Sequence, residues 1–84
     1  MPGRAREILR ANLEAILSDE GKQYLVAERA REKGHEISQQ YISLMVLGKA
    51  RNPGLLKLEA LAAGLDVEFH ELFKPGMKPV RRRE

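Results

Sequence analysis

Amide side chains gather at the start of one segment that has the marks of a short helix. Gln39 and Gln40 follow Ser38, whose hydroxyl oxygen can accept a hydrogen bond from the free amide groups of a first helical turn. Gly48 can take the left-handed conformation that ends a helix, so the segment predicts a helix of about ten residues. An amide donates and accepts hydrogen bonds at the same time, as the edge of adenine in the major groove of DNA requires. We therefore interpret this segment as a recognition helix.

Helical periodicity divides this segment into two faces. Ile42 and Met45, with Val46 more obliquely, fall on the face that would continue a core. The opposite face carries Gln39, Gln40, Ser43, Leu44 and Leu47. The two leucines leave three interpretations open: packing under the tail or another helix, contact with thymine methyl groups, or a protein interface.

The composition limits the chain to one small domain. Eighty-four residues suffice for a single core shared by several helices. The sequence contains no cysteine, which excludes disulfides, thiolate metal sites and a cysteine nucleophile. No apolar run approaches the ~18 to 20 residues that span a membrane, and the first residues lack the hydrophobic region of a signal peptide. We therefore expect a soluble cytoplasmic protein without a membrane partner.

Charge is unevenly distributed along the sequence. Of the 15 basic and 12 acidic residues, residues 74–84 hold five and one, which leaves ten basic and eleven acidic residues in 1–73. The tail from residue 74 is expected to be flexible. Its run of Arg81, Arg82 and Arg83 is either a solvated end or a set of phosphate contacts without sequence preference.

A second basic feature lies before the tail. No acid occurs between positions 36 and 59. The basic residues in that window are Lys49, Arg51 and Lys57. A polyanion could approach this part of the chain without meeting a carboxylate.

Four further helices are predicted from apolar periodicity and from residues that end helices, at 4–17, 23–33, 53–63 and 68–73. The stretch 18–21 breaks the period before the second helix, Gly34 ends that helix, and Gly64 ends the fourth. The expected core residues, some of them only partly buried, are Leu9, Leu13, Ile16, Leu17, Leu25, Val26, Ala27, Ala30, Leu55, Leu58, Leu61, Ala62, Phe69, Leu72 and Phe73. Because no strand pattern occurs, the prediction is an all-α domain.

The order of small, apolar and turn residues across these helices matches a known pattern. Its elements are Ala30, Gly34, Ser38, Tyr41-Ile42-Ser43, Gly48-Lys49, Asn52-Pro53, Leu58, Leu61-Ala62, Leu65 and Glu71-Leu72-Phe73. Over residues 5–73 the chain resembles the helix-turn-helix domain of the Xre/Cro-type repressors, and its longer turn before Ser38 resembles the EspR-type regulators. The resemblance implies a five-helix, lambda-repressor-like DNA-binding domain at 1–73, followed by the basic flexible tail at 74–84. It also implies that the protein binds double-stranded DNA as a homodimer.

The resemblance assigns contacts residue by residue. Bases would be read by Gln39, Gln40 and Ser43, to which the thymine-methyl interpretation adds Leu44. The DNA backbone would be contacted by Lys22, Gln23, Tyr24, Ser38, Lys49, Arg51 and Asn52, and by Arg81, Arg82 and Arg83 of the tail.

The sequence offers little support for an enzyme. His35 and His70 are the two histidines, and neither lies in a metal-ligand spacing. No glycine-rich loop follows a strand, and no serine has the strand-turn-helix setting of a hydrolase nucleophile. We expect neither catalysis nor a metal or other cofactor.

The leading hypothesis is a transcriptional regulator, most simply a repressor associated with the nucleoid. A homodimer that reads half-sites about 34 Å apart would supply the contacts that one small domain lacks. Two alternatives remain: a protein-interaction module that presents Leu44, Val46 and Leu47 to an unknown partner, and a protein that coats DNA through its basic tail.

Overall fold

The computed structural model describes residues 3–50 and 53–76 and is helical within these ranges. Its elements are α1 (Gly3–Leu17), α2 (Glu20–Glu32), α3 (Gln39–Val46), α4 (Leu55–Leu65) and the 3-10 helix η1 (Phe69–Phe73). The described part of the chain contains no strand, so the predicted all-α class is confirmed. The fifth predicted helix is a short 3-10 helix rather than an α-helix.

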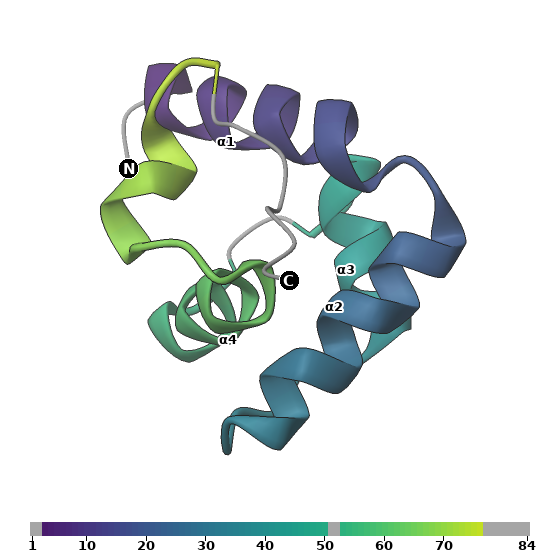
Figure 1. Ribbon diagram of the computed structural model, residues 1–84. Coiled ribbons are helices and arrows are strands. Elements are labelled where there is room, and N and C mark those ends of the chain that lie inside the picture. Colours follow the sequence, from purple (N-terminus) through teal and green to yellow (C-terminus); the bar gives the residue numbers. More distant parts are fainter. Residues whose placement is uncertain (1–2, 51–52, 77–84) are drawn as a thin grey trace.

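The helices enclose one core. Figure 1 shows α1 along the top of the domain, with α2 and α3 descending from it on one side and α4 on the other. α2 packs on both α4 and α3, while α1 packs on η1 and on α3. The largest fully buried side chains are Leu13, Leu17, Ile42, Leu61, Leu65 and Leu72. α2 adds Val26, Ala27 and Ala30, and the turn before α3 adds Ile37, so every helix contributes to the same core.

The second helix begins earlier than its apolar pattern predicts. α2 starts at Glu20 rather than at Gln23, because the Asp19 carboxylate accepts a hydrogen bond from the main-chain amide of Gly21 at 2.7 Å. An aspartate in this position satisfies one of the free amide groups of a first turn. The stretch that seemed to break the helical period is therefore the helix cap and the first turn.

The fourth helix does not end at its glycine. Gly64 lies inside α4 and is buried against α2, where a Cβ atom would collide with the carbonyl oxygen of Val26. The left-handed residue that ends α4 is Asp66, at φ 61°. Gly64 thus permits close approach of two helices, a role different from the helix stop that the sequence predicts.

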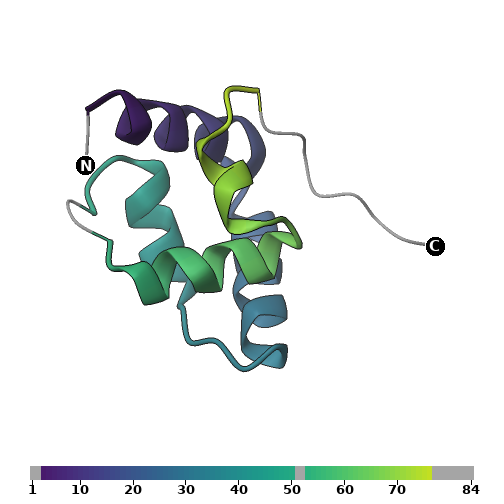
Figure 2. The ribbon, with the colours of Figure 1, turned by 90° about the vertical axis from the view of Figure 1, so that its left-hand side faces the viewer.

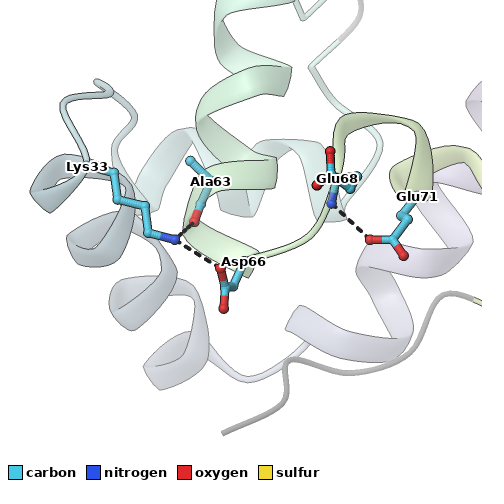
Figure 3. A network of polar contacts seen from close by, with 5 residues as sticks. All are labelled: Lys33, Ala63, Asp66, Glu68 and Glu71. Atoms are coloured by element: carbon cyan, nitrogen blue, oxygen red, sulfur yellow. Dashed lines mark hydrogen bonds and ion pairs between the residues drawn. The ribbon is translucent and has the colours of Figure 1, made fainter. Parts of the chain in front are cut away.

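The end of α4 is also tied to the end of α2. The Lys33 ammonium donates to the Ala63 carbonyl at 2.9 Å and lies 3.2 Å from the Asp66 carboxylate (Figure 3). The main-chain amide of Glu68 donates to the Glu71 carboxylate at 2.9 Å, which caps η1. These contacts satisfy polar groups at the helix ends, which lack partners within their own helices.

Three predicted core residues are exposed: Leu25 on α2, at 39%, Leu55 and Phe69. Leu55 is 60% exposed, because the first turn of α4 lies at the edge of the domain and its buried stripe begins at Leu58. Phe69 is partly exposed, and its ring packs on that of Phe73 with centroids 5.7 Å apart.

A buried asparagine joins the two ends of the described chain. The Asn12 side-chain amide donates to the carbonyl oxygens of Leu72 and Lys74, at 2.8 and 2.9 Å. Since a buried polar group is costly unless it is hydrogen-bonded, Asn12 fixes η1 against α1 at one register.

Among the helices that the structure describes, none combines the length and the apolar character needed to cross a bilayer.

Candidate nucleic-acid interface

The predicted recognition helix has both of its expected ends. The Ser38 hydroxyl accepts a hydrogen bond from the Tyr41 amide at 3.0 Å, and Gly48 follows the helix at φ 77°. Because each signal acts on main-chain groups within a few residues of itself, α3 forms almost where the sequence places it. The Ser38 oxygen, predicted to contact the DNA backbone, serves here as the cap of α3.

The exposed face of α3 brings the predicted base contacts together. Gln40 is exposed, Leu44 is 41% exposed, and Gln39 and Ser43 are partly buried at the margin. Leu47, just after the helix, is 54% exposed and continues the same strip. Both leucines are exposed in the described part of the chain, so no described helix covers them. Packing under the tail stays a prediction, because residues 77–84 lie outside the described residues. The segment Gln39–Val46 carries no charged side chain.

The first turn of α3 is braced from inside the domain. The Gln39 side-chain amide donates to the Gln23 side-chain oxygen at 2.7 Å. Gln23 is 3% exposed, and its own amide donates to the Leu17 carbonyl at 2.7 Å. A chain of hydrogen bonds thus runs from the end of α1 through α2 to α3. The Gln23 side chain lies inside the domain as a support for Gln39, rather than at the surface expected of a phosphate contact.

A second brace holds α3 from the side of α4. The Lys57 ammonium lies 5.4 Å from the centre of the Tyr41 ring and donates to the Glu36 carbonyl at 3.2 Å. A cation over an aromatic face is attracted by the ring quadrupole. Lys57 therefore positions α3 and the turn before it, in addition to any contribution to the charge of the surface.

The start of α2 has mixed charge. Lys22 is exposed, but Asp19 and Glu20 precede it. Tyr24 is exposed, and its hydroxyl donates to the Glu28 carboxylate at 2.9 Å, which raises the pKa of Tyr24. A phosphate at Tyr24 would have to displace this carboxylate. Of the three contacts predicted on α2, Lys22 is therefore the one that geometry and charge favour.

The loop after α3 begins with an exposed lysine. The main-chain amides of Lys49 and Ala50 both donate to the Leu44 carbonyl, at 2.8 and 3.3 Å, so the backbone of Lys49 is held to the end of α3. The other predicted contacts of this loop and of the tail, Arg51, Asn52, Arg81, Arg82 and Arg83, lie outside the described residues.

Sequence reasoning missed an arginine on α1. Arg10 is exposed, and its side chain lies over Gly48, where a Cβ atom would be 2.8 Å from the arginine Nε. A groove of about 500 Å³ opens beside it, and its lining includes Arg6, Glu7 and Arg10 of α1, Met45 of α3 and Pro53. Figure 2 shows the first half of α1 next to the end of α3. No local pattern reveals this contact, because Arg10 and Gly48 are brought together only by the packing of α1 on α3.

The site is therefore an uncharged strip with basic groups near both of its ends. Lys22 precedes Gln23, which is hydrogen-bonded to Gln39 in the first turn of α3, while Lys49 and Arg10 lie at the other end of that helix. Such an arrangement can pair neutral hydrogen-bonding and apolar groups with base edges and cations with phosphates.

Within residues 3–50 and 53–76, no cluster of three or more His, Cys, Asp or Glu side chains could hold a metal ion. No family model, curated protein or solved structure matches the chain.

Proposed function

We propose that this chain binds double-stranded DNA with sequence preference and regulates transcription, with α2 and α3 as the two helices of a helix-turn-helix. The observation that carries the proposal is the 2.7 Å hydrogen bond between Gln39 and the buried Gln23, next to an exposed Gln40. It holds the first turn of α3 in one orientation, and reading base edges requires side chains held in such fixed positions. A helix with this face fits the major groove, which is about 12 Å wide.

The basic residues near the ends of α3 contact the phosphates on either side of that groove. Lys22 contacts phosphates near the start of α3, and Lys49 and Arg10 contact phosphates near its end. Each neutralised phosphate steepens the log-log dependence of affinity on salt by about 0.9. Arg51 and the arginines of the tail would add to this salt dependence, whereas Asn52 is uncharged and would contribute a hydrogen bond only.

The functional unit is a homodimer that acts as a repressor in the cytoplasm, on the nucleoid. One α3 offers too few contacts for strong selectivity, whereas two copies read two half-sites. The centres of those half-sites lie about 34 Å apart, one turn of DNA, when both helices enter the same side of the duplex. Occupation of promoter DNA by the dimer would exclude the transcription machinery.

Selection of bound sequences from a randomised duplex pool at about 150 mM salt tests the proposal, since purely electrostatic binding is weakened there. The expected result is an enriched motif with two-fold symmetry. Gln40→Ala should relax the motif at one position, because a glutamine paired with adenine discriminates by about 1 to 3 kcal/mol. Binding without any motif, lost when residues 77–84 are deleted, would instead identify a DNA-coating protein.

A second function is favoured by the exposure of two leucines on α3. Leu44 and Leu47 are 41% and 54% exposed, and exposed apolar strips often bind other proteins. If the chain is a protein-interaction module, Leu47→Asp abolishes partner binding while Gln40→Ala and Lys49→Ala change nothing. If it reads DNA, the last two substitutions weaken or relax DNA binding.

A further inference from the structure

We propose that α3 is built to read A·T base pairs, with Gln40 facing adenine and with Leu44 and Leu47 against thymine methyl groups. This inference rests on the proposed DNA-binding function and names the sequence class that the site takes. It starts from the chemistry of the strip. One amide and two aliphatic side chains are exposed along it, and no charged residue occurs from Gln39 to Leu47.

The missing charges decide which bases the helix can read well. Guanine is most often bound by arginine or lysine at O6 and N7, and cytosine by an acid at its N4 amine. α3 carries neither kind of side chain. The nearby cations, Lys49 and Arg10, lie beyond its end, beside the loop and α1. G·C pairs beneath this strip would therefore lack the charged partners that most often recognise them.

The leucines also select against G·C pairs. A leucine pressed against the cytosine amine or the guanine O6 oxygen would remove water from a polar group and leave that group without a hydrogen bond, which is costly. Against thymine the same side chain buries a methyl group, which is favourable. The 41% exposure of Leu44 and 54% exposure of Leu47 leave both side chains free to make that contact.

The spacing of the strip sets the length of the A·T element. Gln40, Leu44 and Leu47 follow each other at helical spacing on one face. At about 1.5 Å per residue they extend over about 10 Å of helix. Successive base pairs are about 3.4 Å apart, so the strip covers about three of them. The two braces, Gln23 on Gln39 and Lys57 beside Tyr41, keep it in register.

Uracil in place of thymine tests the inference with the unaltered protein, because the two bases differ only by the C5 methyl group. After the half-site has been selected, each thymine in it is replaced in turn by uracil and the affinity is measured. Loss of one buried methyl should weaken binding by roughly three- to fourfold at each thymine that a leucine contacts.

Variants assign each effect to a side chain. Leu44→Ala and Leu47→Ala should each abolish the sensitivity to uracil at one thymine, as a double-mutant cycle between protein and DNA measures. Leu25→Ala is the matched control: Leu25 lies on α2 at 39% exposure, close to the 41% of Leu44, and its removal should leave the sensitivity unchanged. Circular dichroism confirms that each variant is folded.

The outcomes separate the inference from the proposed function. An enriched motif with G·C pairs at the positions under α3 overturns the inference and leaves the DNA-binding function standing. An A·T motif whose affinity does not change when uracil replaces thymine likewise overturns the inference and leaves the DNA-binding function standing. Failure to enrich any motif overturns the function itself, and the A·T inference with it.

Discussion

Gly64 of α4 lies so close to Val26 of α2 that no side chain fits between the two helices. A Cβ atom at Gly64 would collide with the Val26 carbonyl oxygen and approach its Cγ1 atom to 2.7 Å. The obstacle is main chain, which cannot rotate aside as a side chain can. α2 in turn carries Gln23, which braces α3, so this crossing underlies the position of the candidate recognition helix.

Gly64→Ala should therefore destabilise the domain, although alanine favours helix formation. Overpacking typically costs about 1 to 3 kcal/mol, which outweighs the roughly 1 kcal/mol by which alanine exceeds glycine in a helix. Urea denaturation measures the change in the free energy of unfolding. Gly54→Ala is the control, because a Cβ atom there meets nothing within 4 Å. Equal stability of the two variants would contradict the close crossing.

Asn12→Ala should destabilise the contact between α1 and η1. The carbonyl oxygens of Leu72 and Lys74 would both lose the donor they share, and a buried group left unpaired costs about 1 to 3 kcal/mol. Thermal unfolding followed by circular dichroism measures the loss. Glu14→Ala, on the exposed side of the same helix, should change stability by less than about 0.5 kcal/mol.

Gln23→Met should reduce sequence discrimination without removing DNA binding. Methionine fills the buried space but cannot accept the hydrogen bond from Gln39, so the first turn of α3 loses its brace. The ratio of affinities for selected and scrambled DNA should fall by about three- to tenfold, the equivalent of one hydrogen bond. Adding Gln39→Ala to this variant should lower the ratio of affinities for selected and scrambled DNA by little more. Full additivity of the two substitutions would argue against the coupling.

Lys49→Ala and Arg10→Ala should each flatten the salt dependence of DNA binding. Removal of one phosphate contact lowers the log-log slope by about 0.9, whatever the DNA sequence. Arg31→Ala removes a charge of the same sign near the other end of α2, where Arg31 lies 3.8 Å from Glu28. The log-log slope measured for Arg31→Ala should match that of the unaltered protein. An unchanged slope for Arg10→Ala would place α1 outside the interface.

Tyr24 should titrate at higher pH than an ordinary tyrosine. The hydrogen bond to Glu28, and then the charge of that carboxylate, raises the pKa of Tyr24, while Arg31 lowers it in part. Because the pKa of Tyr24 is higher in the folded than in the unfolded state, its contact with Glu28 stabilises the fold. That contribution is fully present below the unfolded-state pKa and is lost as pH rises through the folded-state pKa. Absorbance of the phenolate in a Tyr41→Phe background, where Tyr24 is the remaining tyrosine, follows the titration. Glu28→Gln should lower the pKa of Tyr24 towards the ordinary value of a tyrosine.

Local signals in the sequence account for most helices and for both ends of α3. Ser38 and Gly48 act on amide and carbonyl groups within a few residues of themselves, so their effect can be predicted without a partner helix. Local signals also misled. A glycine within α4 looks like a stop until α2 is seen beside it, and Asp19 looks like part of a break until its bond to Gly21 is known.

Sequence alone determined the helical class, the amide and leucine strip of α3 and the shortage of acids around it, because periodicity and residue type are local properties. Only the tertiary structure decided that Gln23 supports Gln39 from a buried position, that Arg10 lies over Gly48, and that Gly64 meets Val26. Each of these pairs joins residues on different helices. Their contact depends on how the helices cross, which is set by the packing of the whole core.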